Sequence, residues 1–242
     1  MNKVFKTYDR VAICHRRFPN VTFSNNFDLK NILKLSTDSF FVLLKNRDAE
    51  GRKIFLEKVA KRDTEEFDDY QAIKIRTYAI ALAMYEEETQ IAGSCQILDF
   101  SEISLKHLYS ISSVLEVIEL MNSCSYFKIP TFYLVNLPSF ARVFLDTILS
   151  VAKEKLKQRI VVLKNSDDVK NFIDPDVLPK EYGGTKNFEE VVEDFSELHE
   201  KYGKYIKSLC DVKIDWNKVS ENEKWNDGEE DSIGSFRKLA ID

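Results

Sequence analysis

Apolar and polar positions follow two periods along this chain, and the change from one period to the other predicts strands and helices in turn. Apolar runs at residues 40–44 and 53–56 flank a turn that contains Gly51, so we expect two neighbouring strands there. Residues 68–87 repeat apolar side chains at helical spacing without an intervening Gly or Pro, which predicts a long helix. The first part of the chain therefore contains elements of both kinds.

The later part of the chain continues this alternation. The expected strands are residues 91–100, a segment beginning at Phe132, and residues 160–163. The expected helices are residues 105–124, 138–152 and 189–209. Strands that alternate with helices of this length form parallel crossover units, so the predicted fold class is α/β.

The helix expected over residues 138–152 has the most continuous apolar stripe. Its members are Phe140, Val143, Phe144, Thr147, Ile148 and Val151. A basic turn follows, with Lys153, Lys155, Lys157 and Arg159 and only Glu154 opposing them. The stripe by itself favours ordinary packing on a sheet, and lysines after a helix commonly complement its dipole. An apolar helix beside a cationic turn is also typical of proteins that handle lipids at an anionic membrane.

Composition narrows the classes of function. The chain is 44% hydrophobic and 12% aromatic, which is enough for a substantial core, although part of that volume could instead line a cavity. The formal net charge of −5 argues against a general nucleic-acid binder. No apolar run approaches the ~18 residues of a membrane span and no hydrophobic leader is visible, so we expect a cytoplasmic protein with transient peripheral membrane association.

Candidate chemistry is sparse. Cys14, Cys95, Cys124 and Cys210 lack the paired spacing of metal sites or disulfide frameworks, so neither a metal nor a cofactor is expected. Neither a phosphate-binding glycine loop nor a Gly-x-Ser-x-Gly elbow is present. The histidines lie on separate predicted helices. We therefore expect a protein that is not an enzyme.

Several motifs, in order, resemble the CRAL-TRIO lipid-binding domain, the family of tocopherol-transfer, retinaldehyde-binding and yeast phosphatidylinositol-transfer proteins. The motifs are residues 47–52 (RDAEGR), 88–90 (ETQ) with Gly93, 98–100 (LDF), 134–138 (LVNLP) and 178–184 (LPKEYGG). Residues 234–239 (GSFRKL) are similar to insect members. The resemblance implies a mostly parallel central sheet flanked by helices, with an apolar ligand cavity under a gate helix. No single motif would carry the resemblance alone.

The same resemblance implies a domain organisation. Residues 1–38 would be the remnant of an N-terminal helical region and linker, most of the family's bundle being absent from the sequence. Residues 39–209 would form the lipid-binding domain, and residues 210–242 an acidic, loosely ordered tail. The apolar stripe described above would be the gate helix, with Ser150 at about the place where relatives often have a proline.

The resemblance also places a pocket and a docking site on particular residues. The expected pocket residues are Ile73, Thr77, Ile80, Cys95, Ile97, Ile103, Val117, Leu120, Met121, Phe127 and Phe132. For each of them, ordinary core packing is the alternative. Arg76 falls near the pocket, where its charge needs a partner or a polar end of the ligand.

The expected docking site for phosphoinositides at an anionic membrane consists of Lys128, Lys155, Lys157 and Arg159. Pro130 occupies another position that is basic in relatives, so we expect weaker phosphoinositide affinity than in strong binders. The leading hypothesis is a carrier for one hydrophobic small molecule, such as a tocopherol, retinoid or phospholipid. The main alternative is a protein-interaction scaffold with a collapsed pocket, and an α/β enzyme is a third.

Overall fold

The computed structural model describes residues 18, 20, 22, 40–123, 129–193 and 195–210. The predicted N-terminal remnant, apart from three residues, and the predicted tail beyond residue 210 lie outside these ranges. Phe127 and Lys128 also lie outside them. The domain boundaries stay predictions.

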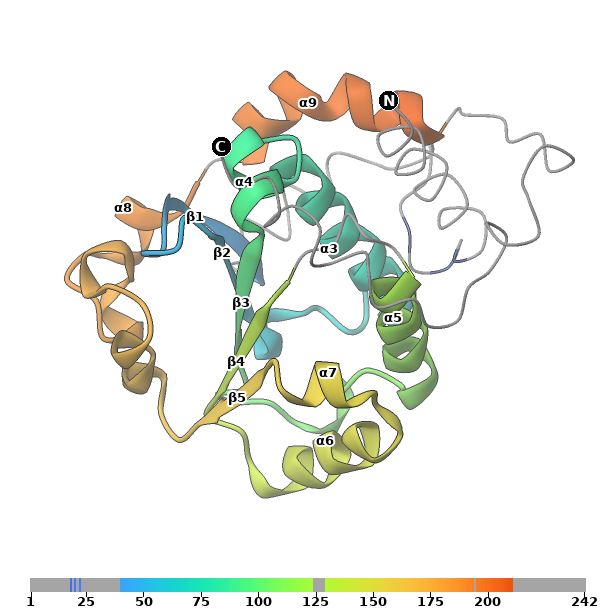
Figure 1. Ribbon diagram of the computed structural model, residues 1–242. Helices are drawn as coiled ribbons and strands as arrows, with labels where there is room; N and C mark the ends of the chain where they lie inside the picture. Colours follow the sequence, from blue (N-terminus) through green and yellow to red (C-terminus); the bar gives the residue numbers. More distant parts are fainter. Residues whose placement is uncertain are drawn as a thin grey trace, which may run out of the picture.

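A five-stranded sheet in the order β1-β2-β3-β4-β5 forms the centre of the molecule (Figure 1). The strands are β1 (Phe41–Arg47), β2 (Lys53–Lys58), β3 (Ser94–Asp99), β4 (Thr131–Val135) and β5 (Ile160–Leu163). The β1–β2 pair is antiparallel, and β2 to β5 run parallel. The helices between the parallel strands supply the crossovers that such strands require, so the predicted α/β class is confirmed.

The helices agree with the sequence pattern in type and differ in their ends. They are α3 (Asp69–Ala83), α4 (Glu87–Ala92), α5 (Ile111–Ser123), α6 (Ser139–Val151), α7 (Glu154–Lys157), α8 (Phe188–Val191) and α9 (Phe195–Cys210). A capping box between Asp68 and Gln71 starts α3. The last predicted helix is two helices, α8 and α9, and α5 begins later than predicted because residues 105–107 form a separate 3-10 turn.

The predicted strand at residues 91–100 also begins late. Ile91 and Ala92 complete α4, and Gly93, with φ of 83°, ends that helix before β3 starts at Ser94. A residue other than glycine would be strained at this φ. The apolar character of Ile91 therefore belongs to a helix, where its side chain is exposed.

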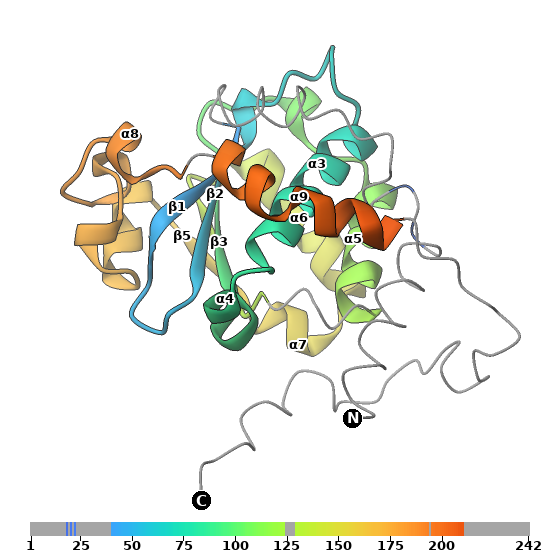
Figure 2. The same cartoon turned by 90° about the horizontal axis from the view of Figure 1, so that it is seen from above.

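Each face of the sheet has its own core. On one face, strand residues such as Phe41 and Phe55 pack against α3, α5 and α9. On the other face, strand residues such as Val42 and Ile54 pack against the 3-10 turns of residues 166–182 and against α8. The views in Figures 1 and 2 show these two layers on opposite sides of the sheet. A strand with a core on each side is apolar throughout, so its sequence does not reveal which residue faces which core.

The segment of residues 178–184 closes the second face. The hydroxyl of Tyr182 donates to Oδ2 of Asp99, the last residue of β3, over 2.7 Å in the interior. Gly184 is required here because a Cβ atom would lie 1.9 Å from the carbonyl oxygen of Leu178. This motif thus packs against the second face of the sheet, with its hydrogen bond to the central strand β3.

Candidate ligand-binding site

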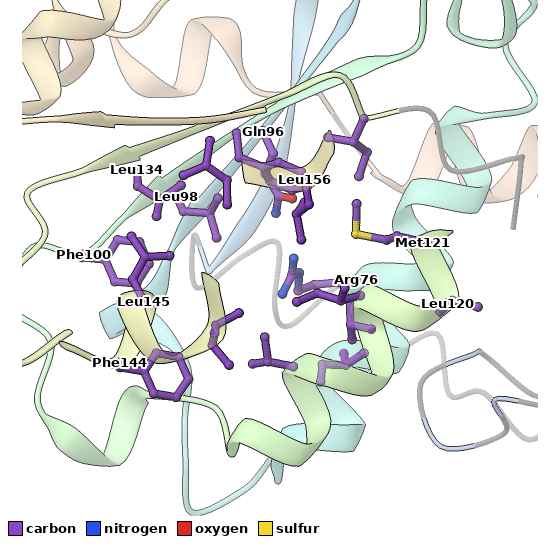
Figure 3. Close-up of a pocket in the computed structure, with 18 of the residues that line it drawn as sticks. Arg76, Gln96, Leu98, Phe100, Leu120, Met121, Leu134, Phe144, Leu145 and Leu156 are labelled. Carbon is purple, nitrogen blue, oxygen red and sulfur yellow. The ribbon is translucent and has the colours of Figure 1, made fainter. Parts of the chain in front are cut away.

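A cavity of about 210 Å³ lies between the first face of the sheet and the helices α3, α5 and α6 (Figure 3). Strands β3, β4 and β5 form its floor, and α7 contributes Leu156 to its wall. Nearly all of the lining side chains are apolar; the polar ones are Arg76, Thr77 and Gln96. An apolar cavity with a few polar groups is the usual construction of a small-molecule site.

Most of the predicted pocket residues line this cavity. They are Ile73, Thr77 and Ile80 from α3, Val117, Leu120 and Met121 from α5, and Phe132 from β4. The helical spacing of apolar residues predicted α3 and α5 and also showed which side of each helix faces inward. The cavity lies on that inward side, between the helices and the sheet. Whether these side chains contact a ligand stays a prediction.

The predictions for Cys95 and Ile97 were wrong. Both side chains lie in the core on the opposite face of the sheet, and the cavity is lined instead by their neighbours Gln96 and Leu98. Successive residues of a strand point to opposite faces, so an assignment shifted by one residue moves the whole strand to the other core.

The register of the sheet shows which residues of β3 face the cavity. Gln96 pairs with Phe132 and Leu98 with Leu134, and paired residues share a face. Ile103, in the loop after β3, does not line the cavity either. Other lining residues that the sequence interpretation missed include Phe100, Leu137, Leu156 and Ile160.

A buried polar cluster adjoins the cavity. The Nε atom of Arg76 lies 3.1 Å from Glu57 Oε2, and Gln96 Nε2 donates to the same oxygen over 3.1 Å. Glu57 is fully buried, and burial raises the pKa of its carboxyl group, against the opposing charges of Arg76 and Arg62. The partner that Arg76 was expected to need is therefore Glu57, on the adjacent strand β2.

The arginine nearest this cluster has its own partner. Arg62 Nη1 donates to Asp69 Oδ1 over 2.7 Å, and its guanidinium carbon lies 4.3 Å from the centre of the Tyr109 ring. Each buried arginine thus lies beside one carboxylate. The two charge pairs leave this region balanced.

Helix α6 covers the cavity with a face that differs from the predicted stripe. Phe144 and Ile148 line the cavity as expected, together with Ala141 and Leu145. The small side chain of Ala141, 1% exposed, lies against the cavity. The predicted stripe did not include it.

The other members of the predicted stripe point outward. Phe140, Val143 and Val151 are 38%, 67% and 65% exposed, and Thr147 is exposed with its hydroxyl donating to the carbonyl of Val143. The helix therefore has apolar side chains on its cavity side and on its solvent side. The prediction that all six members form one inner face was wrong.

The basic turn follows α6 directly. Lys155 is exposed on α7, and Lys157 Nζ lies 3.7 Å from Glu154 Oε2. Arg159 is half-buried before β5, and burial lowers its pKa. Since Leu156 on the same short helix lines the cavity, α7 joins the cavity wall to the cationic surface.

Comparison with known proteins identifies the family. The CRAL/TRIO domain model matches residues 37–184, which is more than half of the chain. The chain belongs to the CRAL/TRIO family. This family is known for lipid binding and transfer.

Two curated relatives are similar to this chain. Clavesin-1 of Xenopus laevis is 29% identical over 161 residues, which cover 65% of this chain and 48% of the relative. Clavesin-2 of Homo sapiens is 26% identical over 159 residues, which cover 64% of this chain and 48% of the relative. The chain spans about half the length of these curated relatives.

The crystal structure of Sfh5 matches the CRAL/TRIO fold of this chain with a TM-score of 0.57 and 17% identity. The match covers 82% of this chain and 72% of that chain, and it supports the fold alone. Within the described part of this CRAL/TRIO chain, no helix combines the length and apolarity needed to cross a bilayer.

Proposed function

We propose that this CRAL/TRIO domain carries one hydrophobic small molecule, of the tocopherol, retinoid or phospholipid kind, and exchanges it with anionic membranes. The observation that carries the proposal is the apolar cavity between the sheet and α6. Transfer of such a ligand requires an enclosed apolar space and no bond-making residues, so we propose a carrier and not an enzyme. The hydrophobic effect supplies the affinity.

The cavity is small for the ligands proposed here, so its wall must move before such a ligand can enter. Its volume of about 210 Å³ is below the ~300–1,000 Å³ common for ligand pockets. A tocopherol or phospholipid therefore requires that the wall move outward. Helix α6 is the wall proposed to move, because solvent-facing Phe140 and Val143 show that this helix is not enclosed in the core.

Opening of α6 at a bilayer is energetically reasonable. Its inner side chains Phe144 and Ile148 would exchange contacts with the cavity for contacts with acyl chains, both of which are apolar surroundings. Burial of each such side chain is worth about 1.5–3 kcal/mol relative to water, so exposure to water alone would oppose opening. Exposed Phe140, Val143 and Val151 would enter the bilayer first.

The basic residues Lys155, Lys157 and Arg159 supply the attraction to an anionic surface. Each cation near such a surface contributes about 1 kcal/mol, so a few of them give reversible docking. Phosphoinositide head groups are the proposed lipids, as the family resemblance implies. Lys128 belongs to the same proposal and lies outside the described residues.

Charge reversal tests the docking site. We expect Lys155→Glu with Arg159→Glu to abolish the preference for vesicles that contain phosphatidylinositol bisphosphate over neutral vesicles, measured by co-sedimentation. The control reverses Lys170 and Lys180, which are exposed on the opposite side of the sheet, and changes the net charge equally. Vesicle preference that survives the first reversal, or that the control removes as well, would contradict specific docking.

A scaffold that binds a protein partner is the second candidate. It requires a pocket filled by side chains, and the cavity observed between α5 and α6 favours the carrier instead. The acidic residues beyond 210, with Trp216 and Trp225, were the proposed partner-binding segment and lie outside the described residues. Co-purification of a protein partner with an empty cavity would support the scaffold.

A further inference from the structure

Two of the three polar side chains that line the cavity, Arg76 and Gln96, point into it from different elements. Figure 3 shows the nitrogen atoms of Arg76, on α3, and the amide of Gln96, on β3, directed into the same space. The side chain of Arg76 is 16% exposed although it lies between the sheet and α3, and it lines the cavity. Arg76 therefore borders the cavity while its guanidinium group lies beside Glu57.

The cluster has unused hydrogen-bonding capacity. The amide of Gln96 is 1% exposed, and its Nε2 is committed to Glu57. Its Oε1 atom is buried without a partner in the described part of the chain, and so is Oε1 of Glu57. Arg76 Nε and the hydroxyl oxygen of Tyr109 are likewise buried without a hydrogen-bond partner among the described residues, so the cluster has unpaired donors as well as unpaired acceptors. Buried polar atoms normally have partners, so a group that both donates and accepts fits this side of the cavity. A bound molecule with a hydroxyl group would supply both functions.

Charge balance indicates which kind of polar group fits. Glu57 and Arg76 form a neutral pair, and Arg62 is matched by Asp69. A ligand carboxylate would bring a second negative charge close to Glu57 in a region that water does not screen. A neutral group that both accepts and donates a hydrogen bond leaves the balance intact.

We propose that Arg76 and Gln96 bind the hydroxyl group of a lipid alcohol whose apolar body fills the cavity. The hydroxyl oxygen accepts a hydrogen bond from the Arg76 guanidinium group, and the hydroxyl proton is donated to Gln96 Oε1. Glu57 does not contact the ligand; it holds both side chains in place through its Oε2 atom. This inference rests on the proposed carrier function and narrows its ligand class to neutral alcohols.

The test compares probes that share one apolar chain. Displacement of bound Nile red by 1-decanol, n-decane and decanoate gives the affinity of each probe for the wild-type protein and for variants. The quantity compared between proteins is the ratio of decanol to decane affinity, because general changes in the cavity cancel in it. Gln96→Met removes the acceptor and leaves the ion pair in place. The triple variant Glu57→Leu/Arg76→Met/Gln96→Met removes these three polar side chains together and leaves no unpaired charge, because Arg62 keeps Asp69 as its partner.

The control is Gln90→Met. Gln90 is exposed on α4 and does not line the cavity, so the same Gln→Met change is made away from the proposed site. We expect the decanol-to-decane ratio to fall about tenfold or more in Gln96→Met and in the triple variant, and to stay unchanged in Gln90→Met. Decanoate should bind the wild type less tightly than decanol.

The outcomes separate the two proposals. An unchanged ratio in Gln96→Met, or a wild type that prefers decanoate, would overturn the hydroxyl site while the carrier function stands. Absence of binding for Nile red and for all probes would instead contradict the carrier function itself, and the hydroxyl site with it. Gln96→Met keeps the charge pair, so the test does not depend on folding of the triple variant.

Discussion

The buried ion pair beside the cavity leads to a stability prediction with an internal control. Arg76→Met would leave the fully buried carboxylate of Glu57 without its nearest cation, 3.1 Å away. Removal of one partner of a buried pair costs about 3–5 kcal/mol. That is a large part of the ~5–15 kcal/mol that stabilises a typical domain. We therefore expect Arg76→Met to lower the urea midpoint strongly at pH 7.

The double variant Glu57→Leu/Arg76→Met reverses this expectation. Apolar side chains of similar size remove both desolvated charges together, and such replacements are commonly neutral or stabilising by about 1–4 kcal/mol. The double variant should unfold at a urea concentration near that of the wild type or above it. Circular dichroism during urea titration measures all three proteins, and the slope of each transition checks that unfolding remains comparable.

The pH dependence supplies the second half of this prediction. Burial raises the pKa of Glu57 in the folded protein above its unfolded value of about 4.3. For such a carboxyl group the favourable contribution is complete below the unfolded pKa and is lost as pH rises through the folded pKa. Without Arg76 the rise in pKa is larger, so the deficit of Arg76→Met should shrink as pH falls from 7 towards 4.5. Equal stability loss in the single and double variants, or a deficit that does not depend on pH, would refute this reasoning.

Further predictions concern other parts of the domain. Tyr182→Phe removes the donor to buried Asp99 and should lower the free energy of unfolding by about 1–3 kcal/mol; an unchanged urea midpoint would contradict the role given to this bond. Val117→Phe fills part of the cavity, so Nile red uptake should fall while the melting temperature stays or rises, and uptake equal to wild type would place the ligand elsewhere. Phe140→Asp with Val143→Asp adds charge to exposed positions of α6 and should weaken vesicle association without loss of stability; a lower melting temperature would show that these side chains are structural.

The sequence predicted the overall architecture correctly, because the spacing of apolar residues gives the type of each element and the alternation of types gives the fold class. The apolar runs at β1 and β2 and the uninterrupted helical spacing of α3 each favour one type of element. Element ends were less certain, since Ile91 reads equally well as the first residue of a strand and as the last turn of a helix. Only the position of Gly93, at φ of 83°, decides between these alternatives.

The candidate site was predictable on helices and less so on strands. One side of α3 and one side of α5 carry the apolar residues, so Ile73 and Val117 were placed correctly. On β3 both sides are buried, so apolarity did not distinguish Ile97 from Leu98. On α6 some apolar residues are exposed to solvent, so the predicted apolar face included residues that do not face the cavity. The small residue Ala141, which does face it, was not predicted.

The polar cluster shows a different limit of sequence reasoning. Arg76 was recognised as a charge that required a partner near the pocket, but its partner Glu57 is distant in sequence and lies on β2. Gln96 escaped notice because the strand was assigned the opposite facing. The partner of Arg76 and the direction of Gln96 both depend on how the strands and helices pack together, which the sequence does not show.

Native mass spectrometry of the purified protein, followed by organic extraction and lipid identification, tests the central claim most directly. The carrier account predicts a stoichiometric adduct that leaves on extraction and proves to be a hydrophobic lipid. A mass equal to that of the bare chain, together with no binding of tocopherol, retinol or phospholipid offered in excess, would contradict it.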